Sequence, residues 1–486
     1  MIKEIEFLAE DPNVKVKSIM ISLIIGAFFA ILNETLLNVA LTTLMEEFHV
    51  TATTVQWLAT GFLLVMGIIT PISALLLQSF TTRQMFMGTM TVFAIGTLIC
   101  ALAINFPLLF MGRILQAVGT GLLIPLIFNA ILLIYPPERR GAVMGTIGLV
   151  ITFAPAIGPP LSGIIVEYLG WRYLFIVVIP FILFSMAFAY KYLTNVGEMT
   201  KPQVDLRSIV YSTLGFGGIV LGFSLVGEGS KGFFDPKIIL MILLGFILTT
   251  LFVTRQLKLA EPLLDMRVFR YPMFSLGVIL FVTVVVVMFS TEIILPMYMQ
   301  GPLALTAATT GLILLPGSLL NGVFSPVMGK LFDRYGPRKI IIPAAVVLAG
   351  DVLIMSQIKI DTPIWMIIVT FTVLMISISA IMMPAQTNGL NELPKNLYPH
   401  GSAVMNTLIP VMGAVGISVF MSLLAQKQQS FIEMSHDPTA QTTQQAAFVS
   451  GFEFVFFVSF GIVFIGLIAS LFVKRPTPAE SIEETS

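Results

Sequence analysis

The fold class that the sequence predicts is an all-α membrane protein with fourteen transmembrane helices. Hydrophobic residues make up 57% of the 486 positions and charged residues only 11%, about half the charged fraction of an ordinary soluble domain. Apolar runs recur along nearly the whole chain, and each has about the 20 residues that a helix needs to cross the hydrocarbon core. Because backbone groups in lipid must be bonded within the segment, these runs are expected to be helices.

The 38 glycines and 28 prolines support this prediction, since both are commoner in membrane helices, where they permit close packing and bends. The stretch 426–449 is rich in Gln, Thr and Ser, and its low apolar content predicts a mobile hairpin or disorder. The spans are expected at residues 18–40, 54–77, 85–104, 108–133, 142–166, 173–193, 207–227, 237–256, 273–299, 306–329, 338–358, 363–387, 402–425 and 450–473.

The distribution of basic residues predicts the orientation. With an even number of spans, both termini lie on one side of the membrane, and the loops of that side carry 20 Lys and Arg residues against five on the other. Lys and Arg are enriched in cytoplasmic loops. We therefore expect a multi-pass protein of the cell (cytoplasmic) membrane with both termini in the cytoplasm.

A short internal repeat divides the chain. Residues 71–83 align without gaps on residues 326–338, and each copy follows the second helix of its half. Paired repeats are typical of secondary transporters, whose substrate sites lie near the midplane between the halves; chance similarity of two cytoplasmic turns is the alternative. The expected order is a cytoplasmic N-terminus (1–17), a first six-helix bundle (18–194), a linker with two extra helices (195–256), a cytoplasmic interfacial linker (257–272), a second six-helix bundle (273–474) and a cytoplasmic tail (475–486).

Composition argues against several function classes. The formal net charge is zero, so nothing indicates a nucleic-acid partner. Cys100 is the only cysteine, which excludes an intramolecular disulfide and a cysteine-based metal cage. The chain has no Walker-type loop and no His-Glu-x-x-His pattern, and His49, His400 and His436 are in or near predicted loops. We expect no enzyme activity, no cofactor and no metal, with a proton gradient as the energy source.

Two segments resemble a known family. Residues 329–339 read Gly-Lys-Leu-Phe-Asp-Arg-Tyr-Gly-Pro-Arg-Lys, and residues 32–41 of the first helix read Leu-Asn-Glu-Thr-Leu-Leu-Asn-Val-Ala-Leu. The chain resembles the major facilitator superfamily, and within it the drug:H+ antiporter 2 group of fourteen-helix, EmrB/QacA-type multidrug exporters, over residues 18–474. The resemblance implies a major facilitator fold, with two six-helix bundles plus two extra central helices.

The turn at 329–339 matches the superfamily's cytoplasmic gating turn between the second and third helices of a bundle. Its glycines allow backbones to approach closely, and its aspartate and arginines can form charge-assisted bonds between helix ends. The first-bundle copy has Gln78 where the pattern has Asp and Thr81 where it has Gly, so a weaker contact is expected there. The gating residues that this turn implies are Gly329, Asp333, Arg334, Gly336 and Arg338.

The fifth helix follows the antiporter motif G-x8-G-x3-GP-x2-GG, with Ala154 and Ser162 in place of two glycines. Small residues let a neighbouring helix approach, and proline bends the helix. The resemblance implies antiport and adds further gating residues, which are Gly145, Gly158, Pro159 and Gly163.

Arg113 in the fourth helix, followed by Gln116 and Gly119, resembles the motif that the family uses in proton coupling. An arginine inside an apolar helix is costly unless it faces protein or water, so it indicates a functional site. The alternative is a structural arginine that bonds to carbonyls at the helix end.

Three carboxylates lie within predicted spans: Glu34, Glu292 and Asp351. Such a group can exchange a proton as access alternates, or neutralise a cationic drug; the alternative for each is a hydrogen bond between helices. We assign Glu34 and Arg113 to proton coupling because they share the first bundle with the antiporter-like helix, and we assign Glu292, Asp351 and Asn33 to the cargo cavity. The family pattern has aspartate at Asn33, and one residue rotates a side chain by about 100°.

The expected function is therefore export of lipophilic, often cationic, drugs across the cytoplasmic membrane in exchange for protons. The alternative is the same fold exporting one dedicated metabolite or lipid-like substrate. The expected partners are the lipid bilayer, small lipophilic substrates and protons, but not nucleic acid, and we expect the chain to function as a monomer.

Overall fold

The computed structural model describes residues 16–50, 52–196, 199, 205–226, 235–435, 437 and 440–475, and they form helices with no strand among them. Most of the expected N-terminal segment and nearly all of the tail lie outside the described residues. The helices are α1 (Val16–Phe48), α2 (Ala52–Ser79), α3 (Thr82–Ala101), α4 (Phe106–Ile134), α5 (Pro137–Leu169), α6 (Tyr173–Ile176), α7 (Val178–Tyr192), α8 (Leu206–Val226), α9 (Pro236–Gln256), α10 (Pro272–Gln300), α11 (Ala307–Tyr335), α12 (Arg338–Met355), α13 (Ile364–Asn391), α14 (Tyr398–Glu433) and α15 (Gln441–Leu471), with 3-10 turns η3 (Met266–Arg270) and η4 (Lys395–Leu397).

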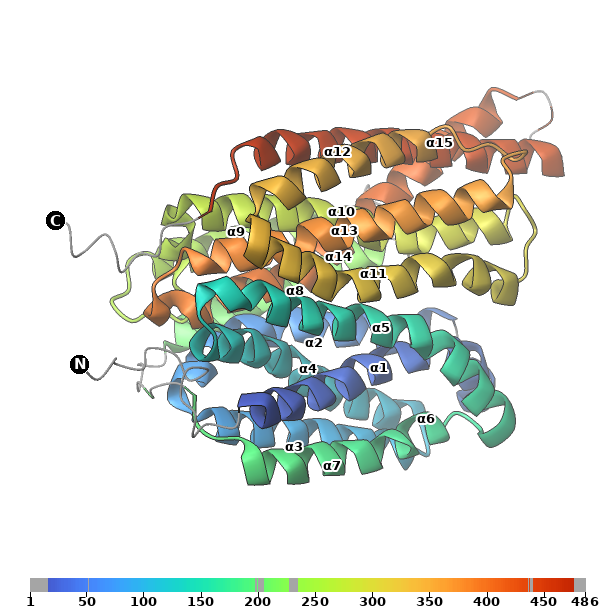
Figure 1. Ribbon diagram of the computed structural model, residues 1–486. Coiled ribbons are helices and arrows are strands. Elements are labelled where there is room, and N and C mark those ends of the chain that lie inside the picture. The colour runs from blue at the N-terminus through green and yellow to red at the C-terminus, as the bar shows by residue number, and fades with distance from the viewer. Residues whose placement is uncertain are drawn as a thin grey trace.

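The helices form two halves that lie side by side (Figure 1). One half contains α1–α7 and the other α10–α15. The extra helices α8 and α9 pack against each other, and α8 also contacts α2 of the first half and α14 of the second. The α8–α9 hairpin therefore covers part of the junction between the halves.

An ion pair closes this hairpin at one end. Arg255 of α9 donates from Nε to Asp205 Oδ2 at 2.6 Å and from Nη2 to Asp205 Oδ1 at 3.0 Å. The bonds from Arg255 hold the pKa of the Asp205 carboxyl well below its usual range. Such bidentate pairs fix geometry as well as adding energy, so the two extra helices are joined as one unit.

Twelve helical segments in the described part of the chain are long and apolar enough to cross a membrane. Helices α5 and α12 are not among the twelve, so the fourteen spans that the sequence predicts are not confirmed. Both helices are nevertheless part of the bundles, because α5 packs against α1 and α11, and α12 packs against α13 and α15.

One predicted span is interrupted. The sequence predicts a single helix over 173–193, whereas the structure has α6 and α7 with a break at Val177. Pro180 has no N–H to donate to the carbonyl of Ile176, so the hydrogen-bond ladder fails at this point. Val177 keeps helical dihedral angles, and the axis continues across the break.

Of the two predictions for 426–449, a mobile hairpin or disorder, disorder is wrong for most of that stretch. Helix α14 continues to Glu433, and α15 already begins at Gln441. Polar side chains are compatible with helix where it projects beyond the hydrocarbon core, because water solvates them. Gln429 donates to Glu433 one turn on at 2.8 Å, a spacing that supports an exposed helix.

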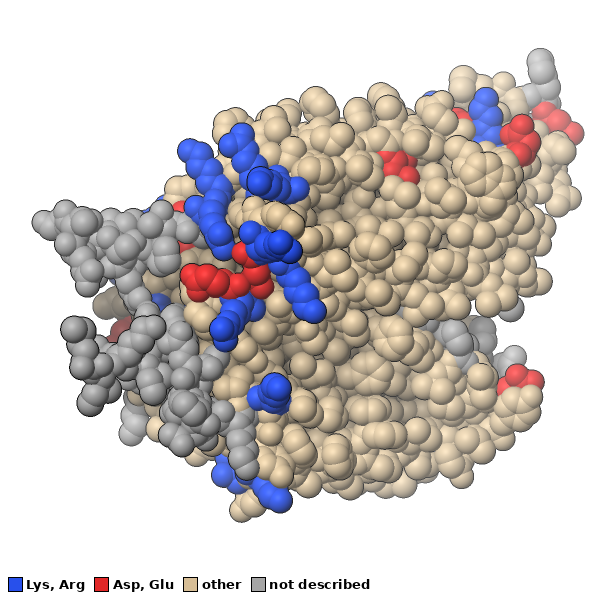
Figure 2. All heavy atoms as spheres, viewed as in Figure 1, with Lys and Arg blue, Asp and Glu red and all other residues tan. Residues whose placement is uncertain are grey.

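Charged side chains on the visible face gather mainly at the end where α1 begins and α15 ends, and Lys and Arg predominate there (Figure 2). Between the two ends lies a broad band that carries almost no charge. Lipid tails offer no partner for charged groups, so this band has the character of a membrane-facing surface.

Candidate functional site

Arg113 lies at the centre of a polar network inside the first bundle. It is only 1% exposed, and its Nη1 donates to Gln116 Oε1 at 3.0 Å and to Asn33 Oδ1 at 3.4 Å. Its guanidinium also lies 4.4 Å from the centre of the Phe62 ring. These contacts bring α1, α2 and α4 together around one cation, and none of them involves a carbonyl at a helix end.

Asn33 therefore occupies the contact with Arg113, while Glu34 lies beside it. Glu34 is half-buried, lies within electrostatic reach of Arg113, and forms no hydrogen bond with any described residue. Leu32 and Leu36, two residues away on either side, line an apolar cavity of about 270 Å³ between α1, α5, α6 and α7. Two residues correspond to about 200° around a helix, so Glu34 lies on nearly the opposite face of α1 from that cavity.

The carboxylates of the second bundle have different surroundings. Glu292 on α10 is exposed and forms no hydrogen bond with described residues. Asp351 on α12 is 5% exposed, and its Oδ2 has no hydrogen-bond partner in the described part of the chain. The main neighbours of α12 are α11, α13 and α15, so Asp351 is buried within the second bundle. The structure therefore brings Glu34, Asn33 and Arg113 together, whereas Asp351 lies apart from them.

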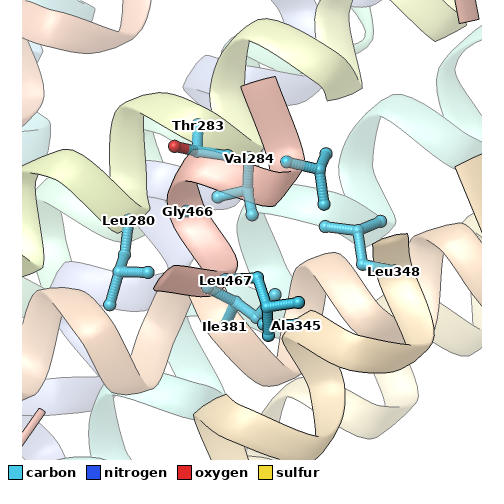
Figure 3. A pocket seen from close by; sticks show the side chains of 9 residues that line it. Leu280, Thr283, Val284, Ala345, Leu348, Ile381, Gly466 and Leu467 are labelled. Atoms are coloured by element: carbon cyan, nitrogen blue, oxygen red, sulfur yellow. The ribbon is translucent and has the colours of Figure 1, made fainter. Parts of the chain in front are cut away.

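A small void lies near Asp351. It measures about 10 Å³ between α10, α12, α13 and α15, and it is almost entirely apolar. Figure 3 shows Thr283 and Gly466 on one side of it and Leu348, one turn before Asp351, on the other. A void of this size has the volume of about one water molecule, so it is too small for an organic cargo.

The turn at 329–339 closes the two halves against each other. Asp333 of α11 accepts hydrogen bonds from the backbone N–H groups of Gly141 and Ala142 of α5, both at 2.8 Å. Gly329 and Gly141 are in such close contact that a Cβ at Gly329 would overlap the carbonyl oxygen of Gly141. Asp333 thus bonds to α5 and not to its neighbouring arginines.

The other residues to which the sequence assigns a gating role have varied surroundings. Arg334 and Arg338 are exposed, and Gly336 ends α11 at φ 81°, a conformation that favours glycine. Gly145 packs against the backbone of Ser325 in α11. Gly158 packs against Thr35 of α1, whereas a Cβ at Gly163 would meet nothing. The side chain of Pro159 lies outside the described residues.

The first-bundle turn also reaches the other half, through neutral groups. Gln78 Nε2 lies 2.9 Å from His400 Nε2 of α14, and His400 Nδ1 accepts from the backbone N–H of Asp265 at 3.1 Å. His400 lies near a loop, as the sequence predicts, because it is the third residue of α14, but it is only 6% exposed. The pair joins α2, α14 and the linker 257–272.

Arg140 is the contact that the sequence did not single out. It is fully buried, and it donates to Asn391 Oδ1 of α13 at 2.9 Å and to Tyr398 OH of α14 at 3.0 Å. Its neighbour Arg139 is exposed. The Arg-Arg pair carries no signal that distinguishes the two, because one step around a helix of about 100° decides which side chain faces inward.

The contacts of Asp333, Arg140 and the Gln78–His400 pair lie at one end of the interface, and we call them the inner gate, after the gating role that the sequence predicts for this turn. All of them cross from the first half to the second. The two halves are therefore bonded to each other at the end where α1 begins and α15 ends, the end at which α5 begins and α11 ends (Figure 1). Among the described residues, no group of three or more His, Cys, Asp or Glu side chains could hold a metal ion.

Known proteins support this description. A model of the Major Facilitator Superfamily matches residues 23–417. The lincomycin resistance protein LmrB of Bacillus subtilis (strain 168) is 49% identical over 95% of this chain and 96% of that protein, and LmrB of Listeria monocytogenes is 46% identical over 94% and 96%. The crystal structure of the human organic anion transporter MFSD10 (TETRAN) covers 94% of this chain and 99% of its own, with TM-score 0.65 and 12% identity, which shows a shared fold. The predicted all-α major facilitator fold is confirmed, and the chain belongs to the Major Facilitator Superfamily, a family of transporters.

Proposed function

We propose that the chain is a proton-coupled antiporter that exports lipophilic, often cationic, drugs across the cytoplasmic membrane. The observation that carries the proposal is the arrangement of Glu34 beside Arg113 and Asn33. Asn33 supplies the hydrogen bond to the cation, so the Glu34 carboxylate is left without a permanent partner. A carboxylate at that depth can exchange a proton when access to it alternates.

A proton and a cationic drug would compete for the Glu34 carboxylate. A protonated Glu34 is neutral, whereas the ionised form attracts a cation by about 4 kcal/mol at 4 Å and an effective dielectric near 20. Entry of a cationic drug from one side would favour loss of the proton, and proton uptake from the other side would release the drug. Arg113 would limit the affinity of this site for cations, since its own positive charge lies within electrostatic reach.

Opening and closing of the inner gate would alternate access to Glu34 between the two sides of the membrane. The bonds of this gate are formed in this structure, so the cytoplasm would reach the interface only after those of Asp333, Arg140 and Gln78 break. Rocking of one half against the other is the usual motion of such transporters. The glycine contact between Gly141 and Gly329 allows the two helices to close without a side chain between them.

The nature of the cargo rests on relatives and on charge. The two LmrB proteins are named for lincomycin resistance, which favours a drug as cargo. Exposed Glu292 would attract cationic drugs as they pass, and Asn33 would lie near them. We keep Asp351 as a cargo residue of the second bundle, with a smaller expected effect because it is buried away from Glu34.

We further propose the fourteen-helix topology of the drug:H+ antiporter 2 group. In this topology α5 and α12 also cross the membrane, together with the twelve long apolar segments described above. The gathering of Lys and Arg at the end where α1 begins supports cytoplasmic termini (Figure 2). The protein would work as a monomer in the cell membrane, since each chain holds both halves of the interface.

Purified protein in proteoliposomes with an imposed pH gradient tests the proposal. Ethidium should accumulate when the gradient is imposed, with a matching movement of protons, and a protonophore should abolish both. Competition by several unrelated drugs would favour multidrug export, whereas competition by one compound alone would favour a dedicated substrate. Accumulation that ignores the pH gradient would contradict proton coupling.

A further inference from the structure

Three amide side chains at the interface between the halves are buried with polar atoms unpaired. They are Asn129 of α4, Gln386 of α13 and Asn406 of α14, which are 7%, 1% and 4% exposed. Asn129 Oδ1, Asn406 Oδ1 and both Gln386 Oε1 and Nε2 have no hydrogen-bond partner among the residues that the structure describes. We call these three residues the amide belt.

Asn129 and Asn406 lie on either side of a contact that crosses the interface. Ser402 of α14 donates from Oγ to the carbonyl of Pro125 in α4 at 3.3 Å. Asn129 follows Pro125 by four residues, which is about one helical turn. Asn406 follows Ser402 by the same spacing, and its Nδ2 donates to the Ser402 carbonyl at 2.8 Å. The two amides therefore belong to the α4–α14 contact.

Gln386 lies on the face of α13 that meets α5 and α14. Met383, three residues earlier, approaches the position of a Cβ on Gly148 of α5 to 3.0 Å. Leu390, four residues later, approaches the position of a Cβ on Gly401 of α14 to the same distance. Residues three and four apart share a helix face, so Gln386 lies on the face of α13 from which Met383 reaches Gly148 of the first half.

The amide belt lies next to the inner gate. Asn129 and Gln386 are each five residues before the last residue of their helix, and Asn406 is eight residues after the first residue of α14. At about 1.5 Å per residue, these positions are roughly 7 to 12 Å inside the helix ends that carry the gate. Opening of the gate would therefore expose the belt to the cytoplasm before deeper parts of the interface.

Unpaired buried amides are unfavourable, because they have lost water and gained nothing in return. Most buried polar side chains in native proteins have a partner, so Gln386, with neither of its atoms paired, is an exception. Swapping the positions of the Gln386 amide oxygen and nitrogen does not change this, because both atoms are unpaired. The residue is understandable if its partner is present only when the gate is open.

The chemistry of the belt defines that partner. Amides carry no charge, and they both donate and accept hydrogen bonds. They suit hydroxyl and amide groups, whereas a lipophilic cation without such groups gains nothing from them. We propose that the amide belt is an inner binding site for the uncharged hydroxyl and amide groups of a cargo taken up from the cytoplasm. The proposal rests on the export function above and adds a polar, hydrogen-bonding part to the cargo.

Equilibrium binding of two radiolabelled probes to the purified full-length protein tests this site. Lincomycin carries several hydroxyl groups and an amide, whereas tetraphenylphosphonium is a lipophilic cation with no hydrogen-bonding group. Gln386→Met keeps the length of the side chain and removes both polar ends. It should weaken lincomycin binding by about tenfold, the loss of roughly one to two neutral hydrogen bonds, and leave the Kd for tetraphenylphosphonium within about twofold.

Thr387→Val is the matched control, because Thr387 is the next residue, is fully buried, and donates to Met383 of its own helix at 2.8 Å. It should leave the binding of both probes unchanged. Melting in detergent should show Gln386→Met at least as stable as wild type, since an unpaired amide has been removed. Asn406→Leu provides a second, independent reduction of lincomycin binding.

Equal weakening of both probes by Gln386→Met would overturn the proposal, because Gln386 would then act on the gate and not on the cargo. Unchanged lincomycin binding in both Gln386→Met and Asn406→Leu would overturn it as well. A wild-type protein that binds tetraphenylphosphonium but not lincomycin would contradict the proposed role of the amide belt, but not the proposed export of drugs. A wild-type protein that binds neither would contradict the proposed export of drugs.

Discussion

Replacement of Asp333 by Asn should open the inner gate. The carboxylate accepts two hydrogen bonds from the start of α5, both at 2.8 Å, and bonds to charged groups contribute about 1.5–3 kcal/mol each. An amide keeps one acceptor oxygen but presents an NH2 group to the second N–H. After allowance for water, which replaces these bonds in the open state, we expect the closed gate to lose about 2 kcal/mol, or roughly 30-fold in the ratio of closed to open protein.

Spin labels across the gate measure this ratio. In a Cys100→Ala background, cysteines at the exposed positions Arg139 of α5 and Arg338 of α12 would carry nitroxides for pulsed electron–electron distance measurements. The wild-type labels should give mainly one short distance, and Asp333→Asn should add a second, longer one. The exposed Asp361 between α12 and α13, changed to Asn, is the control and should leave the distribution unchanged. Identical distributions for Asp333→Asn and wild type would refute the role of Asp333 in the gate.

The neutral contact of the first bundle predicts a smaller effect. Gln78→Ala removes the hydrogen bond to His400. A neutral bond contributes about 1 kcal/mol, so the ratio of closed to open protein should fall roughly fivefold. Transport should accordingly slow much more in Asp333→Asn than in Gln78→Ala. Equal slowing of transport by the two variants would contradict the prediction that the turn with Asp333 holds the halves together more strongly than the turn with Gln78.

Two further predictions concern carboxylates outside the gate. Glu292→Gln should weaken export of a cationic dye by about tenfold, or 1.4 kcal/mol, and spare an uncharged compound. Asp351→Asn should have less effect, because Asp351 is buried within the second bundle. If either variant lost export of both the dye and the uncharged compound, that residue would not be a binding residue for cationic cargo. Burial raises the pKa of Glu392, although its bonds from Met273 and Phe274 oppose this. The folded protein therefore binds more protons at Glu392 than the unfolded chain does, and stability should fall as pH rises above the usual carboxyl pKa. Melting in detergent should show this slope reduced in Glu392→Gln, and an unchanged slope would exclude Glu392 as its source.

Much of the fold could be predicted because lipid imposes simple constraints. Thirteen of the fourteen predicted spans each fall on one helix, and the span 173–193 falls on α6 and α7, since a long apolar run in lipid can only be helical or part of a barrel. The sequence was less informative where water is the solvent: the polar ends of α14 and α15 are helical although their composition predicts disorder. Composition alone does not tell an exposed helix from a loop.

The candidate site could be predicted only to the level of residues, and not of contacts. The sequence indicated Asn33, Glu34 and Arg113, but the rotation of α1 decides that Asn33 bonds to Arg113. The same limit applies to Arg140 and His400, whose roles depend on which helix face is buried and on where α14 begins. One residue of rotation or extension moves a side chain from the surface to the interface.

Cargo-driven proton release from the detergent-solubilised protein tests the central claim most directly. Addition of a cationic drug to wild-type protein in weakly buffered solution should release protons, which a pH-sensitive dye records. Glu34→Gln keeps the shape of the side chain and removes the titratable group, so it should abolish this release, and proton-driven transport with it, while the melting temperature stays near that of wild type. Proton release and uphill transport at the wild-type level in Glu34→Gln would contradict the account.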